Sequence, residues 1–184
     1  SNMIYIVAQH MSLEHPCKLV SLLESSTSLN VLKAEDGMQL DANTIYVLPY
    51  IHEIYIKDNK IVLAKAGSTS TPPRPSIDQF FTSLANSYKE HAIGIIFSGS
   101  GIDGVQGCKA INVVGGIVIA QPPYSATFDS MPKAAMQLAH VDLLLETEHI
   151  WLGSEKNDLA SKLELEDFYT RGGSLWTRKD DLFM

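Results

Sequence analysis

Short runs of apolar residues recur along the chain, separated by longer segments in which apolar positions follow a helical period. The short runs are typical of buried strands, and the longer amphipathic segments predict helices that cover them. Strands are predicted at 3–9, 44–49, 92–99, 116–121 and 141–146, with a further strand that begins near 30 and ends at the Asp36-Gly37 turn. Helices are predicted in 12–25, 76–91, 103–115 and the second half of 122–140.

Residues 52–66 differ from this pattern because apolar positions alternate on both sides of a turn at 58–60. Such alternation predicts an antiparallel β-hairpin. Ser76 is expected to cap the helix that follows it, with Ile77, Phe80, Phe81 and Leu84 on one apolar face. Strands that alternate with helices predict a mostly parallel α/β sheet covered on both faces, a three-layer fold with a small added hairpin.

The segment from 147 to 184 has a different character, since it is charged and carries Trp151, Trp176 and the pair Gly172-Gly173. We expect the folded domain to cover 1–146. The remainder is expected to be a helix with a docking tail, or the start of a linker.

The overall composition excludes several classes of protein. The chain has 184 residues, of which 45% are hydrophobic and 19% charged, and its net charge is −7. Nucleic-acid binding is not expected, because it needs clustered Lys and Arg on a basic surface. Cys17 and Cys108 stand apart and predict neither a disulfide nor a zinc site. No leader and no apolar run of about 18 residues is present, so we expect a cytoplasmic protein with no membrane span.

The stretch FSGSGIDG, at 97–104, contains Gly99, Gly101 and Gly104 in the spacing of a dinucleotide-binding loop. A nucleotide-binding domain remains one hypothesis. It is disfavoured because the next strand ends in Gln121 rather than an acid, and because Asp103 would repel a pyrophosphate. The loop instead places the Asp103 carboxylate at the end of a buried strand, either as a functional acid or as a cap for the helix that follows.

His10 also follows a buried strand directly, so it is expected at the same edge of the sheet as Asp103. A histidine and an acid at that edge are the base and the orienting acid of a catalytic triad. The nucleophile is not apparent, because neither Ser98 nor Ser100 fits the pattern of a nucleophile elbow.

Seven segments in order, VAQHM, KAEDGMQL, YVLP, RPSID, AIGIIFSGSGIDG, GGIVIAQ and MPKAA, resemble the catalytic domain of chemotaxis protein-glutamate methylesterases, the CheB type. The resemblance covers about 4–146. It implies a doubly wound α/β fold and a cofactor-free, metal-free Ser-His-Asp hydrolase that cleaves glutamyl methyl esters on chemoreceptors and deamidates their glutamines. It assigns His10 and Asp103 to the triad, the Ser100 backbone amide to the oxyanion hole and Arg74 to a substrate-side loop. His10 is expected to accept the serine proton on Nε2.

The chain departs from the family at its start, because the nucleophilic serine of the family lies in a turn upstream of the strand that precedes His10. We therefore expect a domain that lacks the first strand and helix of the family and is inactive alone, or a regulatory module that keeps the fold without the activity. The sheet edge left open is expected to be covered by another copy of the chain, as in a homo-oligomer, by the tail or by a crystal neighbour. The receiver domain that usually precedes this domain in the family is not expected in this sequence. Some relatives are fused to a methyltransferase, and the segment after about 147 could lead to one, so a fused or separate methyltransferase or receiver domain is an expected partner.

Overall fold

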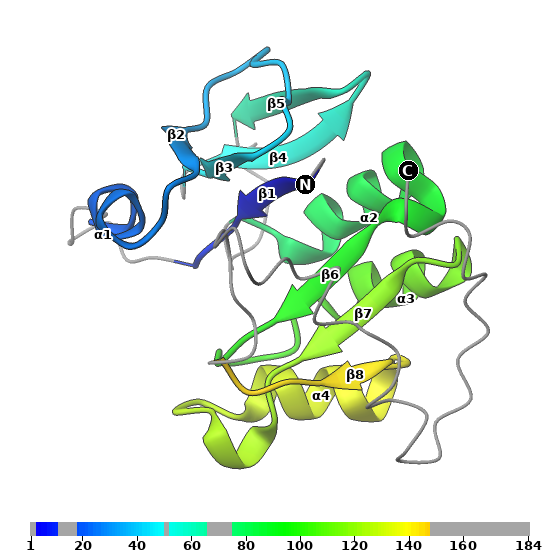
Figure 1. Ribbon diagram of the computed structural model, residues 1–184. Coiled ribbons are helices and arrows are strands. Elements are labelled where there is room, and N and C mark those ends of the chain that lie inside the picture. The colour runs from blue at the N-terminus through cyan, green and yellow to red at the C-terminus, as the bar shows by residue number, and fades with distance from the viewer. Residues whose placement is uncertain (1–2, 11–17, 50–51, 66–74, 148–184) are drawn as a thin grey trace.

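The computed structural model describes residues 3–10, 18–49, 52–65 and 75–147 (Figure 1). Its strands form two three-stranded parallel sheets and an antiparallel hairpin. The first sheet has the order β1-β3-β2, with β1 at Ile4–Val7, β2 at Asn30–Lys33 and β3 at Thr44–Val47. The second has the order β6-β7-β8, with β6 at Ile93–Ile96, β7 at Ile117–Ala120 and β8 at Leu143–Leu144. The hairpin pairs β4, His52–Lys57, with β5, Lys60–Lys65.

Four α-helices and two short 3-10 turns connect the described strands. The α-helices are α1 at Leu19–Ser26, α2 at Ile77–Tyr88, α3 at Val105–Val113 and α4 at Ser130–Leu138, and the turns are η1 at Lys89–His91 and η2 at Pro123–Ser125. The mostly parallel α/β fold with a hairpin is confirmed. The predicted start of the first helix, at residue 12, lies outside the described residues.

Local sequence explains two of these elements well. The Ser76 hydroxyl accepts a hydrogen bond from the Gln79 amide at the start of α2, so the predicted cap is confirmed. The hairpin turns at Asp58 and Asn59, both with positive φ of 51° and 57°, a conformation that Asp and Asn adopt more readily than most residues.

The largest hydrophobic core joins the hairpin, α2 and α3 to both sheets, with Tyr46 of β3 as its buried member from the first sheet. Its fully buried members include Ile54, Phe80, Ile111 and Val118. A smaller core lies under α1 on the first sheet and centres on Ile45 and Val47. The two sheets are therefore joined through packed side chains.

The two sheets are not joined by strand pairing in the described part of the chain. β1 and β6 are each the edge strand of their sheet, and Figure 1 shows them at facing margins with arrows in the same direction. The parallel strands thus form two sheets where the sequence predicted one, which leaves one edge of each next to the other.

Candidate active site

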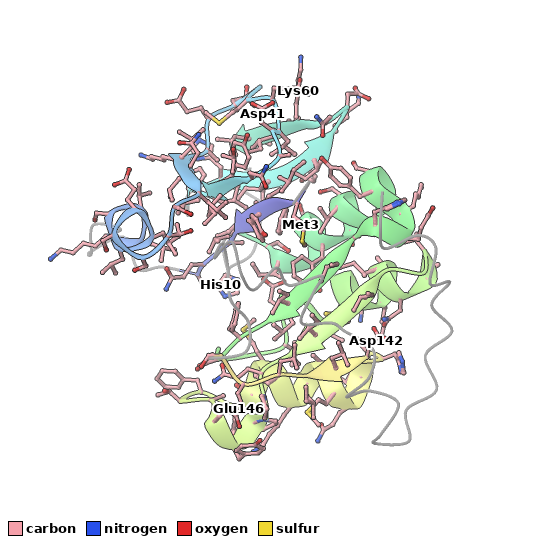
Figure 2. The ribbon with its side chains drawn as sticks, in the orientation of Figure 1. Met3, His10, Asp41, Lys60, Asp142 and Glu146 are labelled. Carbon is pink, nitrogen blue, oxygen red and sulfur yellow. The ribbon has the colours of Figure 1, made fainter. Side chains whose placement is uncertain are left out.

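His10 and Asp103 meet where β1 and β6 end. His10 lies three residues beyond the last residue of β1, and Asp103 lies in the glycine loop between β6 and α3. The ring nitrogen Nε2 of His10 is 2.9 Å from Oδ2 of Asp103, and the side chains are 25% and 9% exposed. Figure 2 labels His10 on the side of β1 that faces the second sheet. The contact expected from two strand ends is therefore confirmed.

The Asp103 carboxylate also sits at the N-terminus of α2. Its Oδ2 accepts a hydrogen bond from the Ile77 amide at 2.8 Å, and its Oδ1 accepts one from the Asp78 amide at 3.1 Å. The Ser76 hydroxyl donates a longer bond of 3.5 Å to Oδ1. The hypothesis that Asp103 caps the helix after it, α3, was wrong: the side chain caps α2, which precedes it in sequence, and pairs with His10 at the same time.

Opposing effects act on the pKa of Asp103. Burial raises it, but hydrogen bonds from His10 and from the Ile77 and Asp78 amides, with the charge of His10, outweigh burial and hold the pKa below its usual value. The carboxylate is therefore kept in its charged form, as an orienting acid requires.

The bond to Asp103 uses Nε2 of His10, which leaves Nδ1 as the ring nitrogen able to accept a proton. The expectation that His10 accepts the serine proton on Nε2 was therefore wrong, because Nε2 is the nitrogen bonded to Asp103. Sequence places the histidine at a strand end but does not determine which way its ring turns.

The glycine loop is fixed by hydrogen bonds from its own backbone. The Gly99 amide donates to the Phe128 carbonyl at 2.9 Å, the Gly101 amide to the Ser130 hydroxyl at 3.1 Å and the Gly104 amide to Asp78 Oδ1 at 2.9 Å. Gly101 and Gly104 have φ of +92° and +102°, which side chains rarely adopt. Because a phosphate loop binds through free amides, these bonds argue strongly against a nucleotide site.

Ser100 lies in the same loop and is exposed. Its backbone amide makes no hydrogen bond to another described residue, so it is available to an incoming oxygen. Arg74, the residue expected in a substrate-side loop, lies outside the described residues, as do His15, Cys17 and His149.

The structure shows no nucleophile or second base hydrogen-bonded to His10 among the described serine, histidine and cysteine side chains. No serine hydroxyl among the described residues is hydrogen-bonded to His10. His140 faces Asp142, and His91 faces Glu90. Burial, with the charge of Asp78, raises the pKa of Cys108 to about 12, so this thiol stays protonated and unreactive.

Sequence reasoning missed the residues that hold the glycine loop. Gln121 is 5% exposed, its Oε1 accepts from the Ser98 amide at 2.9 Å, and its Nε2 donates to the Ser125 carbonyl at 3.0 Å. The sequence did show an uncharged polar residue at the end of a buried strand. A polar residue at this position disfavours a nucleotide site, and it also indicates a side chain that forms hydrogen bonds with the neighbouring loop.

The described ranges contain no cluster of three or more His, Cys, Asp or Glu side chains able to hold a metal ion. None of their helices is long and apolar enough to cross a membrane.

A sequence model of the CheB methylesterase family matches residues 1–152, most of the chain. The chain belongs to the CheB methylesterase family.

Comparisons with individual proteins give the following similarities. The chain is 29% identical over 145 residues to a putative protein-glutamate methylesterase/protein-glutamine glutaminase of Leptospira interrogans, covering 79% of this chain and 75% of the relative. It is 32% identical over 166 residues to an uncharacterized 104.1 kDa protein of Rhodobacter capsulatus, of which it spans 17%. Its fold matches the crystal structure of the Thermotoga maritima CheB methylesterase catalytic domain with a TM-score of 0.69 and 26% identity, covering 79% of this chain and 78% of that one.

Proposed function

We propose that this chain forms the hydrolase domain of a protein-glutamate methylesterase that acts on methylated glutamates of chemoreceptors in a bacterial phosphorelay, with His10 as general base and Asp103 as orienting acid. The observation that carries the proposal is the 2.9 Å bond between His10 and a carboxylate that is otherwise held by backbone amides. The names of the relatives supply the substrate class.

In this mechanism Nδ1 of His10 accepts the proton of a serine hydroxyl as the serine oxygen attacks the ester carbonyl. Asp103 stabilises the imidazolium that forms. The Ser100 amide donates to the oxyanion, and the proton on His10 passes to the leaving methoxide, which departs as methanol. Water then attacks the acyl-enzyme with its proton passing through His10, which releases glutamate. An amide substrate releases ammonia in place of methanol.

The nucleophile is proposed to arrive on a strand that lies between β1 and β6. The Val7 carbonyl accepts from the Leu48 amide of the first sheet, so the alternation of a parallel ladder turns the backbone groups of Ile4 and Ile6 to the opposite edge. In the second sheet, the Ala92 and Ile96 carbonyls accept from Ile117 and Gln121. The backbone groups of Ile93 and Ile95 are thereby turned away from β7.

The outward backbone groups at the two facing edges make no hydrogen bond to any other described residue; these are the groups of Ile4, Ile6, Ile93 and Ile95. A strand between them would pair with both, and a parallel one would end beside His10 and Asp103. A second copy of the chain, or residues 147–184, are the alternative occupants. Equilibrium sedimentation tests whether a second copy of the chain occupies this position. A dimer that dissociates when Ile4 is replaced by Pro would favour the second copy over a strand of the same chain.

The main alternative is a binding or regulatory module without catalysis, and it is favoured by the absence of a serine bonded to His10 among the described residues. Fusion to a methyltransferase or a receiver domain is compatible with either function.

The deciding experiment compares the chain alone with a chimera in which the first strand and nucleophile turn of the Thermotoga domain precede Met3. Methanol release from a methylated receptor fragment is expected from the chimera and not from the chain alone. The release should be abolished by His10→Ala and unchanged by Lys133→Ala, which removes an exposed ion pair with Asp129. A folded chimera without activity would favour the regulatory module.

A further inference from the structure

Two carboxylates form reciprocal hydrogen bonds with the N-termini of α2 and α3. Asp103 stands just before α3, and its side chain accepts the Ile77 and Asp78 amides that begin α2. Asp78 stands in the first turn of α2, and its Oδ1 accepts the Gly104 and Gly107 amides at the start of α3, both at 2.9 Å. Asp103 therefore adds to the Ser76 cap of α2, and Asp78 caps α3, whose N-cap residue Gly104 has no side chain of its own.

We propose that Asp78 is a positioning residue that fixes the Asp103 carboxylate against His10. The inference rests on the proposed roles of His10 and Asp103 and adds a residue that the pattern of the sequence did not single out.

The geometry that carries the proposal is a closed ring of hydrogen bonds. The Asp78 amide donates to Asp103, and the Gly104 amide, in the peptide that directly follows Asp103, donates back to the Asp78 side chain. Rotation of the Asp103 backbone away from His10 would break the Gly104 bond. A shift of α2 would break the bonds to Asp103. Neither can move without the other.

Close packing of the two helices reinforces the ring. A methyl group at Gly107 would stand against Cβ of Phe81 and 3.2 Å from the carbonyl oxygens of Ile77 and Asp78. The helices are therefore in close contact at the point where the Asp78 carboxylate accepts the Gly104 and Gly107 amides.

Asp78 acts through hydrogen bonds rather than through its charge. Among the described residues, no hydrogen bond or ion pair joins its carboxylate to His10, and both partners of Oδ1 are backbone amides. The titratable groups of the described residues that face this cluster are His10 from the end of β1, Asp103 from the glycine loop, Asp78 from α2 and Cys108 from α3. An asparagine at position 78 would keep the accepting oxygen and remove only the charge.

The test uses Asp78→Ala and Asp78→Asn in the full chain, and it reads the ring of His10 by long-range ¹H–¹⁵N NMR in alkaline buffer, where imidazole is neutral. The wild-type ring is expected to carry its proton on Nε2 alone. Asp78→Ala should lose that single-tautomer pattern and show the Nδ1-protonated form as well, whereas Asp78→Asn should keep the wild-type pattern.

Asp142→Ala is the matched control. Asp142 also accepts a backbone amide, that of Val118 at 2.8 Å, and faces a histidine, His140, but it lies at the start of β7 and β8, away from His10 (Figure 2). This variant should lose stability and leave the His10 spectrum unchanged.

A folded Asp78→Ala with the wild-type His10 pattern would overturn the proposal. If Asp78→Ala does not fold, the spectrum of Asp78→Asn tests the proposal. Loss of the single tautomer in Asp78→Asn would show that the charge of Asp78 matters, which would contradict a role through hydrogen bonds. The spectrum needs neither nucleophile nor substrate. An inactive chimera therefore counts against the proposed function alone, and an unchanged spectrum against the role of Asp78 alone.

Discussion

The two halves of the candidate site are built very differently. Asp103 is held on the second sheet by the amides at the start of α2 and by the bond between Gly104 and Asp78. The loop before it is tied to Phe128, Ser130 and Gln121. His10 follows β1 on the first sheet, and within the described residues its side chain makes the single bond to Asp103.

The fold of the second sheet therefore organises Asp103 and the glycine loop in advance, whereas His10 and a nucleophile must be brought to them. Asp103 and the glycine loop belong to one packed unit, held together by hydrogen bonds that need no substrate to form. His10, the proposed base, reaches that unit from a sheet whose strands do not pair with it in the described part of the chain. The proposed strand between β1 and β6 would bring a nucleophile to His10 and Asp103. It would also set the distance between the first sheet, which carries His10, and the second, which carries Asp103.

The largest expected effect is on catalysis, where the two halves must act together. In the active chimera, His10→Ala and Asp103→Asn should each lower kcat by about 10⁴-fold or more, because a triad fails when either its base or its orienting acid is lost. Methanol release from the receptor fragment measures both variants. If Asp103→Asn kept more than about a tenth of the activity, the acid would have no orienting role.

The next effect concerns the stability of the acid half alone. Gly107→Ala should lower the free energy of unfolding by about 1–3 kcal/mol, because the added methyl group meets Phe81 and two carbonyl oxygens of α2. Urea denaturation measures the loss. Gln106→Ala, an exposed position on the same helix, is the control and should change stability by about 0.5 kcal/mol or less. Equal effects of the two variants would contradict close packing of α2 on α3.

The sequence predicted the parts of this site that depend on local pattern. Apolar runs located the strands, and strand ends located His10 and Asp103 on one edge. Ser76 was recognised as a cap because a serine before an amphipathic segment is a local signal. Asp78 was missed because its partners, Gly104 and Gly107, lie on another helix, and no spacing within the chain encodes that contact. The ring nitrogen of His10 and the separation into two sheets likewise depend on tertiary packing.

The dependence of stability on pH should also distinguish the halves. The folded-state pKa of Asp103 lies below its unfolded value of about 3.9, so its charged form stabilises the fold above that pH. This contribution is lost as pH falls through the folded pKa. Asp103→Asn should therefore be less stable than wild type near neutrality, by about 1 kcal/mol, and the gap should close as the pH falls below about 4. Chemical denaturation across that range measures the gap, and a constant difference would contradict a stabilised carboxylate.

The smallest expected effect is the loss of His10 from the folded chain without a nucleophile. His10→Ala should change the free energy of unfolding by about 0.5 kcal/mol or less, because its side chain is 25% exposed and makes one described hydrogen bond. Asp103 keeps the Ile77 and Asp78 amides after His10 is removed, so no buried charge is left without a partner. Asp103→Ala is the comparison, since it leaves those amides without an acceptor and should cost about 1–2 kcal/mol. Equal losses in the two variants would mean that His10 helps hold the acid in place, and the acid half could then no longer be regarded as organised before the base arrives.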